Sequence, residues 1–165
     1  LALSENCGVK VSEVHGMSQR GGSVITHVRV GDSVHSPIVS LGGADYLISF
    51  EALEASRAAC YLKPGGTAIV NTQRILPMPG FTGAAAYPDD AIFALSSYRV
   101  ESADALGIAV ACGSQKALNL VLLGMFSRHL PFGEKAWQDA IAACVPQKTL
   151  EVNLAAFARG RALMN

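Results

Sequence analysis

Apolar and polar side chains alternate in two stretches near the start of the chain, and apolar runs follow further along. Residues 9–14 (VKVSEV) and 23–30 (SVITHVRV) alternate, and the second is rich in β-branched side chains, so both predict strands. Residues 44–50 and 67–71 are more continuously apolar and predict strands buried on both faces of a sheet. Residues 95–101 predict a further strand.

Helical segments separate and follow these strands. The helices expected from apolar spacing and end signals cover residues 51–61, 103–112, 115–129, 134–144 and 150–164. Residues 1–8 predict the tail of a further helix, closed by Gly8. Strands that alternate with helices form parallel crossover units, so the pattern predicts an α/β fold in three layers, a mostly parallel sheet with helices on both faces. An antiparallel insert at residues 23–40 and a helical C-terminal third complete one domain over residues 1–165.

Composition narrows the classes of partner. Of the 165 residues, 50% are hydrophobic and 16% are charged, with 13 basic and 13 acidic side chains. This mixture predicts a packed core, and its neutral balance argues against a nucleic-acid partner. No apolar run reaches the roughly 18–20 residues of a membrane helix, so no membrane partner is expected. The low charge content indicates apolar surface that another subunit covers.

The cysteines and histidines show no metal-binding pattern. The four cysteines stand singly, without CxxC spacing, at Cys7, Cys60, Cys112 and Cys144. We therefore expect no metal bound by this chain, and buried, reduced cysteines in the core of a cytoplasmic protein. His27 lies within an alternating strand, which predicts a surface or interface histidine.

The ends of the predicted strands indicate where a ligand would bind. In open parallel sheets ligands lie outside the carboxyl ends of the strands. The strands predicted here end at residues 15–16, 50–51, 71–72 and 101–102, and we expect these ends to line one edge. Asn71 and Thr72 are candidate site residues on this ground alone.

The loop over residues 15–22 carries the densest chemistry. Its candidate binding residues are His15, Ser18, Gln19, Arg20, Gly21 and Gly22. Glycines let backbone N–H groups approach a ligand, and a guanidinium binds phosphate or carboxylate through two hydrogen bonds. A tight turn whose polar side chains cap the neighbouring backbone explains the same composition, and both interpretations stay open.

Other chemical motifs are incomplete. Residues 16–20 approach the G-x-S-x-G elbow of hydrolases, but the last glycine is missing and a strand follows where the elbow needs a helix. Residues 64–66 (PGG) precede a strand, so they predict a turn and no phosphate loop. Glu51 is interpreted as a first-turn helix residue, with a catalytic carboxylate as the alternative. The catalytic residues stay unknown, and spacing alone favours a binding or partner module.

Five segments in order resemble a known family. Residues 13–31 (EVHGMSQRGGSVITHVRVG) resemble the gamma subunits and gamma domains of the 2-oxoacid:ferredoxin oxidoreductases, in the form typical of the indolepyruvate branch. The segments that agree with it are residues 36–57, 62–72, 103–124 and 151–160. The resemblance covers nearly the whole chain.

This resemblance implies a reaction and partners. The family oxidatively decarboxylates a 2-oxoacid, with coenzyme A and ferredoxin as acceptors. It uses thiamine diphosphate and iron–sulfur clusters, which other subunits mainly hold. The resemblance implies that the loop over residues 15–22 faces the partner's thiamine site or the substrate and coenzyme A, where Arg20 would neutralise an anionic group.

Three alternatives remain open on the sequence. The chain could be a free-standing nucleotide- or coenzyme A-binding module, a docking protein without a ligand, or a family member specific for pyruvate or 2-oxoglutarate. A homodimer is also left open. Ferredoxin would be reached only through the complex.

The sequence departs from the family at its start. Members begin with a strand and a glycine-rich GxGGQG turn into the first helix, and neither precedes residue 9 here. We expect Leu1 to follow on the order of 25–30 further residues, the size of the missing part of a βαβ unit. A nucleotide-binding role that depends on that turn is not expected of the sequence as it stands.

Overall fold

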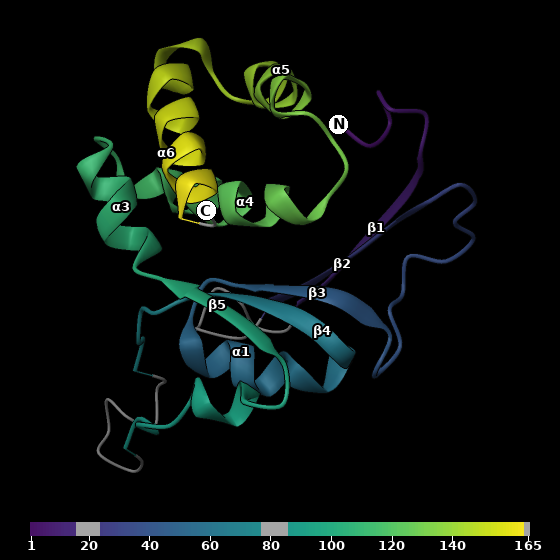
Figure 1. Ribbon diagram of the computed structural model, residues 1–165, viewed down its shortest axis with the longest axis vertical. Helices are drawn as coiled ribbons and strands as arrows, with labels where there is room; N and C mark the ends of the chain where they lie inside the picture. Colours follow the sequence, from purple (N-terminus) through teal and green to yellow (C-terminus); the bar gives the residue numbers. More distant parts are fainter. Residues whose placement is uncertain (16–23, 77–85, 164–165) are drawn as a thin grey trace.

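The computed structural model describes residues 1–15, 24–76 and 86–163. Its centre is a parallel sheet of three strands in the order β3 (Ala44–Ser49), β4 (Leu62–Asn71) and β5 (Arg99–Ala103). Helices cover both faces of this sheet (Figure 1). The predicted three-layer α/β class is confirmed.

Each face of the sheet has its own helical layer. One face carries α1 (Ala52–Ala58), which continues into a 3₁₀ turn at Ala59–Tyr61. The other face carries the C-terminal helices, drawn in green and yellow in Figure 1. They are α3 (Ala105–Ala111), α4 (Leu118–Phe126), α5 (Glu134–Cys144) and α6 (Leu150–Ala162), with 3₁₀ turns at Gln115–Ala117, Ser127–His129 and Gln147–Thr149.

The central strand β4 explains why two layers are needed. Residues 66–71 of β4 are all buried. Successive side chains of a strand point to opposite faces. Accordingly Ile69 packs among the C-terminal helices, while Ala68 and Val70 pack with Ala55 of α1 and with Leu95. A run of apolar residues, buried on both sides, is what a central parallel strand requires.

Two predicted boundaries shift. The strand predicted at residues 95–101 begins only at Arg99, because Phe93–Leu95 forms a 3₁₀ turn. The helix predicted from residue 103 begins at Ala105, because Asp104 caps it and accepts a hydrogen bond from the N–H of Gly107 at 2.8 Å. An aspartate at this position satisfies an N–H group that has no partner inside the helix.

The strand predicted at residues 9–14 belongs to a different sheet. It forms β1 (Gly8–His15), which pairs antiparallel with β2 (Val24–Gly31) in a separate two-stranded hairpin. The expectation that its end lines the edge of the parallel sheet is therefore wrong. The alternating pattern of this strand explains the difference. Alternation is typical of antiparallel strands with one solvated face, whereas a strand inside a parallel sheet is apolar throughout.

The first residues form one helical turn, and the residue that ends it is not the one predicted. The N–H of Cys7 donates to the carbonyl of Ala2 at 2.9 Å, and the N–H of Asn6 donates to that of Leu3 at 3.2 Å. Asn6 has φ of 59°, in the left-handed region. These are the hydrogen bonds of a Schellman helix end, with Asn6 in the position predicted for Gly8. Gly8 instead begins β1.

Helices α4 and α6 approach each other through glycine. A Cβ atom on Gly160 would lie 1.9 Å from the carbonyl oxygen of Val121, and one on Gly124 would lie 2.2 Å from that of Phe157. Both obstacles are backbone atoms, so no side-chain rotation relieves them. The two helices therefore pack backbone against backbone, and this contact sets the thickness of the C-terminal layer.

Replacing Gly160 by alanine should force α4 and α6 apart. We expect Gly160→Ala to lower the free energy of unfolding by about 2–4 kcal/mol, since the added methyl overpacks a rigid contact. Gly133→Ala is the control, because a Cβ there meets nothing within 4 Å. Denaturant unfolding of both variants checks this, and equal stabilities would contradict the close-packing argument.

Candidate functional site

The carboxyl ends of β3 and β4 are joined by the side chain of Asn71. This residue is completely buried. Its Nδ2 donates to the carbonyl of Phe50 at 2.9 Å and to Oε1 of Gln73 at 3.3 Å, while its Oδ1 accepts from the N–H of Ala105 at 3.0 Å. Asn71 thus ties the end of β3 and the start of α3 to the end of β4.

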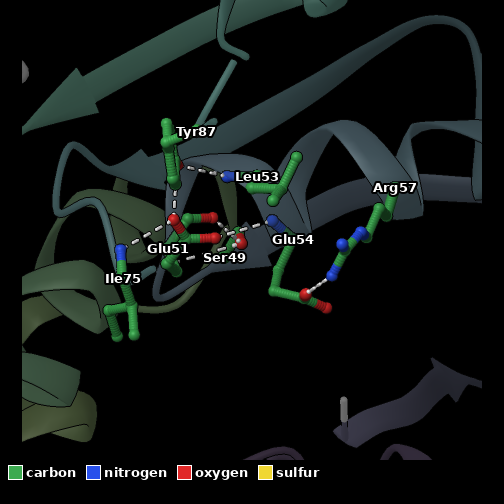
Figure 2. Close-up of polar contacts among 7 residues, drawn as sticks. All are labelled: Ser49, Glu51, Leu53, Glu54, Arg57, Ile75 and Tyr87. Atoms are coloured by element: carbon green, nitrogen blue, oxygen red, sulfur yellow. Dashed lines mark hydrogen bonds and ion pairs between the residues drawn. The ribbon is translucent and has the colours of Figure 1, made fainter. Parts of the chain in front are cut away.

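Glu51 is the buried carboxylate at this edge. It is 7% exposed and caps α1, with Oε2 accepting from the N–H of Glu54 at 2.9 Å. Its Oε1 accepts from the N–H of Ile75 at 3.2 Å and from the hydroxyl of Tyr87 (Figure 2). The carboxylate therefore joins three segments, namely the first turn of α1, the chain after β4, and the chain that leads towards β5.

Tyr87 completes this cluster. Its hydroxyl accepts from the N–H of Leu53 at 3.0 Å while it donates to Glu51. Partial burial and then the adjacent Glu51 carboxylate raise the pKa of Tyr87 to about 12. The guanidinium of Arg74 lies 5.4 Å from the centre of the Tyr87 ring, and its Nη1 lies 3.1 Å from Oδ1 of Asp89. Both ends of the segment between β4 and Tyr87 are thus held against α1.

The helix starts at this edge have their N–H groups in use. In α1 the N–H of Ala52 donates to the carbonyl of Gln73 at 3.2 Å, and those of Leu53 and Glu54 donate to Tyr87 and Glu51. In α3 the N–H of Ala105 donates to Asn71. A phosphate usually binds to such N–H groups. Here a backbone carbonyl and side chains of the protein itself accept from these N–H groups, so this edge works as a scaffold for the loops that leave it.

The structure places some of the predicted site residues and not others. Asn71 and Thr72 lie at the carboxyl edge as predicted; Thr72 is exposed, and its N–H donates to the carbonyl of Ala103 at 3.0 Å. His15 ends β1, on the separate hairpin. Ser18, Gln19, Arg20, Gly21 and Gly22 lie outside the described residues.

Glu51, predicted as a residue of the first helical turn, caps the helix and also binds two other segments. It is the residue before the first turn, and its second carboxylate oxygen holds Tyr87 and Ile75. Tyr87 lies 36 residues from Glu51, and no spacing rule connects two residues so far apart, so the sequence pattern does not indicate this pair. The three polar contacts of Glu51 explain its burial without a catalytic role.

Of the two positions predicted for His27, surface or interface, the exposed surface position is wrong. The side chain is 7% exposed, its Nδ1 accepts from the N–H of Val39 at 2.9 Å, and its ring packs edge-on against Tyr61 with 5.3 Å between centroids. Because Nδ1 accepts, the neutral ring carries its proton on Nε2. His27 therefore attaches the hairpin to the segment that follows it and to the end of α1.

The expectation of uniformly buried cysteines is also wrong. Cys60 and Cys144 are exposed, Cys7 and Cys112 are half-buried, and all four are free thiols. Within residues 1–15, 24–76 and 86–163 no group of three histidine, cysteine or acidic side chains is placed to hold a metal ion. In the same ranges, none of the helices has the length and apolar character needed to span a membrane.

The fold is one that solved subunits of oxidoreductases share. It superposes on a keto/oxoacid ferredoxin oxidoreductase gamma subunit from Geobacter sulfurreducens with a TM-score of 0.69 and 20% identity, covering 98% of this chain and 83% of that one. A pyruvate oxidoreductase subunit from Thermotoga maritima gives a TM-score of 0.67 at 19% identity, covering 98% of this chain and 82% of that one. These likenesses establish the fold.

The chain belongs to the pyruvate ferredoxin/flavodoxin oxidoreductase family, whose model matches residues 1–163. An indolepyruvate oxidoreductase subunit IorB from Archaeoglobus fulgidus is 39% identical over 165 residues, which cover 96% of this chain and 82% of that protein. The protein of the same name from Thermococcus kodakarensis is 39% identical over 166 residues, with the same shares covered. The resemblance read from five segments is confirmed.

Removing the Asn71 amide should weaken the whole edge. We expect Asn71→Ala to lower the free energy of unfolding by about 2–4 kcal/mol, because it leaves the Phe50 carbonyl and the Ala105 N–H buried without this partner. Asn119→Ala on the exposed side of α4 is the matched control, with a change below about 0.7 kcal/mol. Urea unfolding measures both, and a loss below about 1 kcal/mol for Asn71→Ala would refute the bridging role.

The Tyr87–Glu51 contact should be lost at alkaline pH. An unfolded tyrosine ionises near its ordinary pKa of 10.0 and the folded one at about 12, so this contribution to stability is full below pH 10 and lost as the pH rises to 12. We expect Tyr87→Phe to be less stable than the wild type at pH 8, and the difference to narrow between pH 10 and 12. Thermal melting over pH 8–12, with Tyr98→Phe as control, tests this. A constant difference would contradict it.

Proposed function

We propose that this chain is the subunit without metal clusters of an indolepyruvate:ferredoxin oxidoreductase. The observation that carries the proposal is the 39% identity to archaeal indolepyruvate oxidoreductase subunits along 96% of the chain. In the reaction the bond between the carboxylate and the keto carbon breaks and a thioester bond to coenzyme A forms. Carbon dioxide and a proton are released, and two electrons pass to ferredoxin.

The residues described here do not fit thiamine diphosphate or an iron–sulfur cluster. A cluster needs several thiolates at one point, and the four cysteines lie on separate elements. A diphosphate needs free N–H groups, and those of Ala52 and Ala105 are in use. We therefore assign both groups to a partner subunit, as the resemblance implied, and derive no chemical step through them from this chain.

The contribution of this chain is proposed to lie in the loop over residues 15–22. His15 pairs with Val24 at the end of the hairpin, so the two ends of the loop are brought together by the β1–β2 ladder. In the assembled complex we assign this loop to the substrate and coenzyme A side, with Arg20 neutralising a phosphate or carboxylate. Asn71 and Thr72 belong to the supporting edge.

The competing functions have weaker support. A free-standing nucleotide-binding module would use the helix starts at the sheet edge, where the N–H groups already have protein partners. A member specific for pyruvate has in its favour the description of the family and a structural likeness at 19% identity, whereas the relatives at 39% identity are named for indolepyruvate. The cytoplasmic location and a ferredoxin reached through the complex remain part of this proposal.

Assembly with a thiamine- and cluster-binding subunit should produce activity. We expect the co-expressed pair to reduce ferredoxin when given indolepyruvate and coenzyme A, and this chain alone to be inactive. Arg20→Ala should raise the KM for either indolepyruvate or coenzyme A by about 10–100-fold, because a charge-assisted hydrogen bond to that substrate is lost. The matched control is Arg99→Ala, an exposed arginine on β5.

Two results would count against this. A co-expressed pair that oxidises no 2-oxoacid would end the proposal as a whole. Unchanged kinetics in Arg20→Ala would remove the assignment of the loop while leaving the family function in place.

A further inference from the structure

A small surface cavity in the C-terminal helical layer carries two arginines. Its volume is about 170 Å³, and its lining residues are Arg128, Glu134, Ala158, Arg161 and Ala162. Arg128 belongs to the 3₁₀ turn that follows α4, Glu134 begins α5, and Arg161 lies near the end of α6. Two cations and one carboxylate from three separate elements therefore line the same small space.

Arg161 is held in place by the protein itself. Its Nη1 donates to Oγ of Ser127 at 2.7 Å, and its Nε lies 3.3 Å from Oε2 of Glu134. Ser127 is 1% exposed, and its hydroxyl donates in turn to the carbonyl of Gly124 at 2.6 Å. The guanidinium of Arg161 is therefore fixed before any ligand arrives.

The carboxylate of Glu134 does not neutralise both arginines. Its Oε2 is paired with Arg161, and its Oε1 accepts from Nε2 of Gln138 at 3.2 Å. Arg128 is exposed, and it forms no hydrogen bond or ion pair within residues 1–15, 24–76 and 86–163. The five N–H groups of Arg128 therefore stay available to a ligand, and the lining residues keep one positive charge in excess.

The arrangement of these donors favours a tetrahedral anion over a carboxylate. A carboxylate presents two oxygens in one plane, which match the edge of a single guanidinium. A phosphate group presents at least three acceptor oxygens in different directions and carries a charge of about −1.5 to −2 at neutral pH, so it can accept from two guanidinium groups at once. The cavity is smaller than the roughly 300–1,000 Å³ of pockets that enclose drug-sized ligands, so the enclosed group is small.

We propose that this cavity binds a phosphate group between Arg128 and Arg161, either as the free ion or as the end of a larger ligand. Arg161 would supply the fixed guanidinium and Arg128 the free one. The bound phosphate would join the turn after α4 to the end of α6, so its binding stabilises the folded C-terminal layer. This site is independent of the function proposed above, because only the residues that line the cavity define it.

Calorimetric titration of the full chain with inorganic phosphate tests the site. We expect saturable binding with a dissociation constant of about 1 mM or below, and at least about tenfold weaker binding by Arg128→Gln, which loses charge-assisted hydrogen bonds. Arg159→Gln is the matched control, since Arg159 lies two residues from Arg161 on α6 and lines a different cavity. It removes the same charge, and its affinity should stay within about twofold of the wild type because solvent and salt screen a more distant charge.

A second variant decides the matter if Arg128→Gln melts early. Ala158→Glu puts a carboxylate into the cavity from an exposed position on α6 and should abolish phosphate binding. Thermal melting of each variant checks that it folds, and phosphate should raise the melting temperature of the wild type.

Three results overturn the proposal: no saturable phosphate binding by the wild type, wild-type affinity in the folded variants, or acetate binding as tightly as phosphate. Phenyl phosphate separates the two sources of the group. Binding at least as tight as that of inorganic phosphate assigns the site to an esterified phosphate, and weaker binding assigns it to the free ion. Oxidation of a 2-oxoacid by the complex is measured separately, so failure of the phosphate site leaves the proposed function in place.

Discussion

The buried amide of Asn71 is the interaction on which the rest of the sheet edge depends. β4 is buried on both faces, so a polar side chain at its end must find every partner inside the protein. Asn71 does so by joining Phe50 after β3 to Ala105 at the start of α3. Once these connections are held, Glu51 lies where its carboxylate can cap α1 and bind Tyr87. One amide thus connects the ends of β3 and β4 to the start of α3.

The polar groups at this edge of the sheet bond mainly to one another. In many α/β proteins the strand ends themselves hold the ligand. Here the N–H groups at the start of α1 donate to Gln73, Tyr87 and Glu51, so these donors already have partners inside the protein. In the function proposed above, recognition falls to the loop that joins β1 and β2.

The sequence predicted the layers well because burial leaves a local pattern. The apolar runs at β3 and β4 and the α5 boundaries, Glu134–Cys144, follow from periodicity and end signals. The position of Asn71 at a strand end also followed. Its bridging role did not, because Phe50 and Ala105 lie 21 and 34 residues away and no spacing rule connects them. Tyr87 was missed for the same reason.

The sequence by itself determined the class of fold, the order of its elements and the family, since these depend on short-range patterns and on ordered segments along the chain. The alternation of β1 already indicated an antiparallel strand, but only the tertiary structure decided that His27 is buried. It also decided that Gly124 and Gly160 bring two helices into backbone contact. Each of these depends on which distant segment packs opposite, and side-chain packing across the core settles that choice beyond the reach of any local pattern.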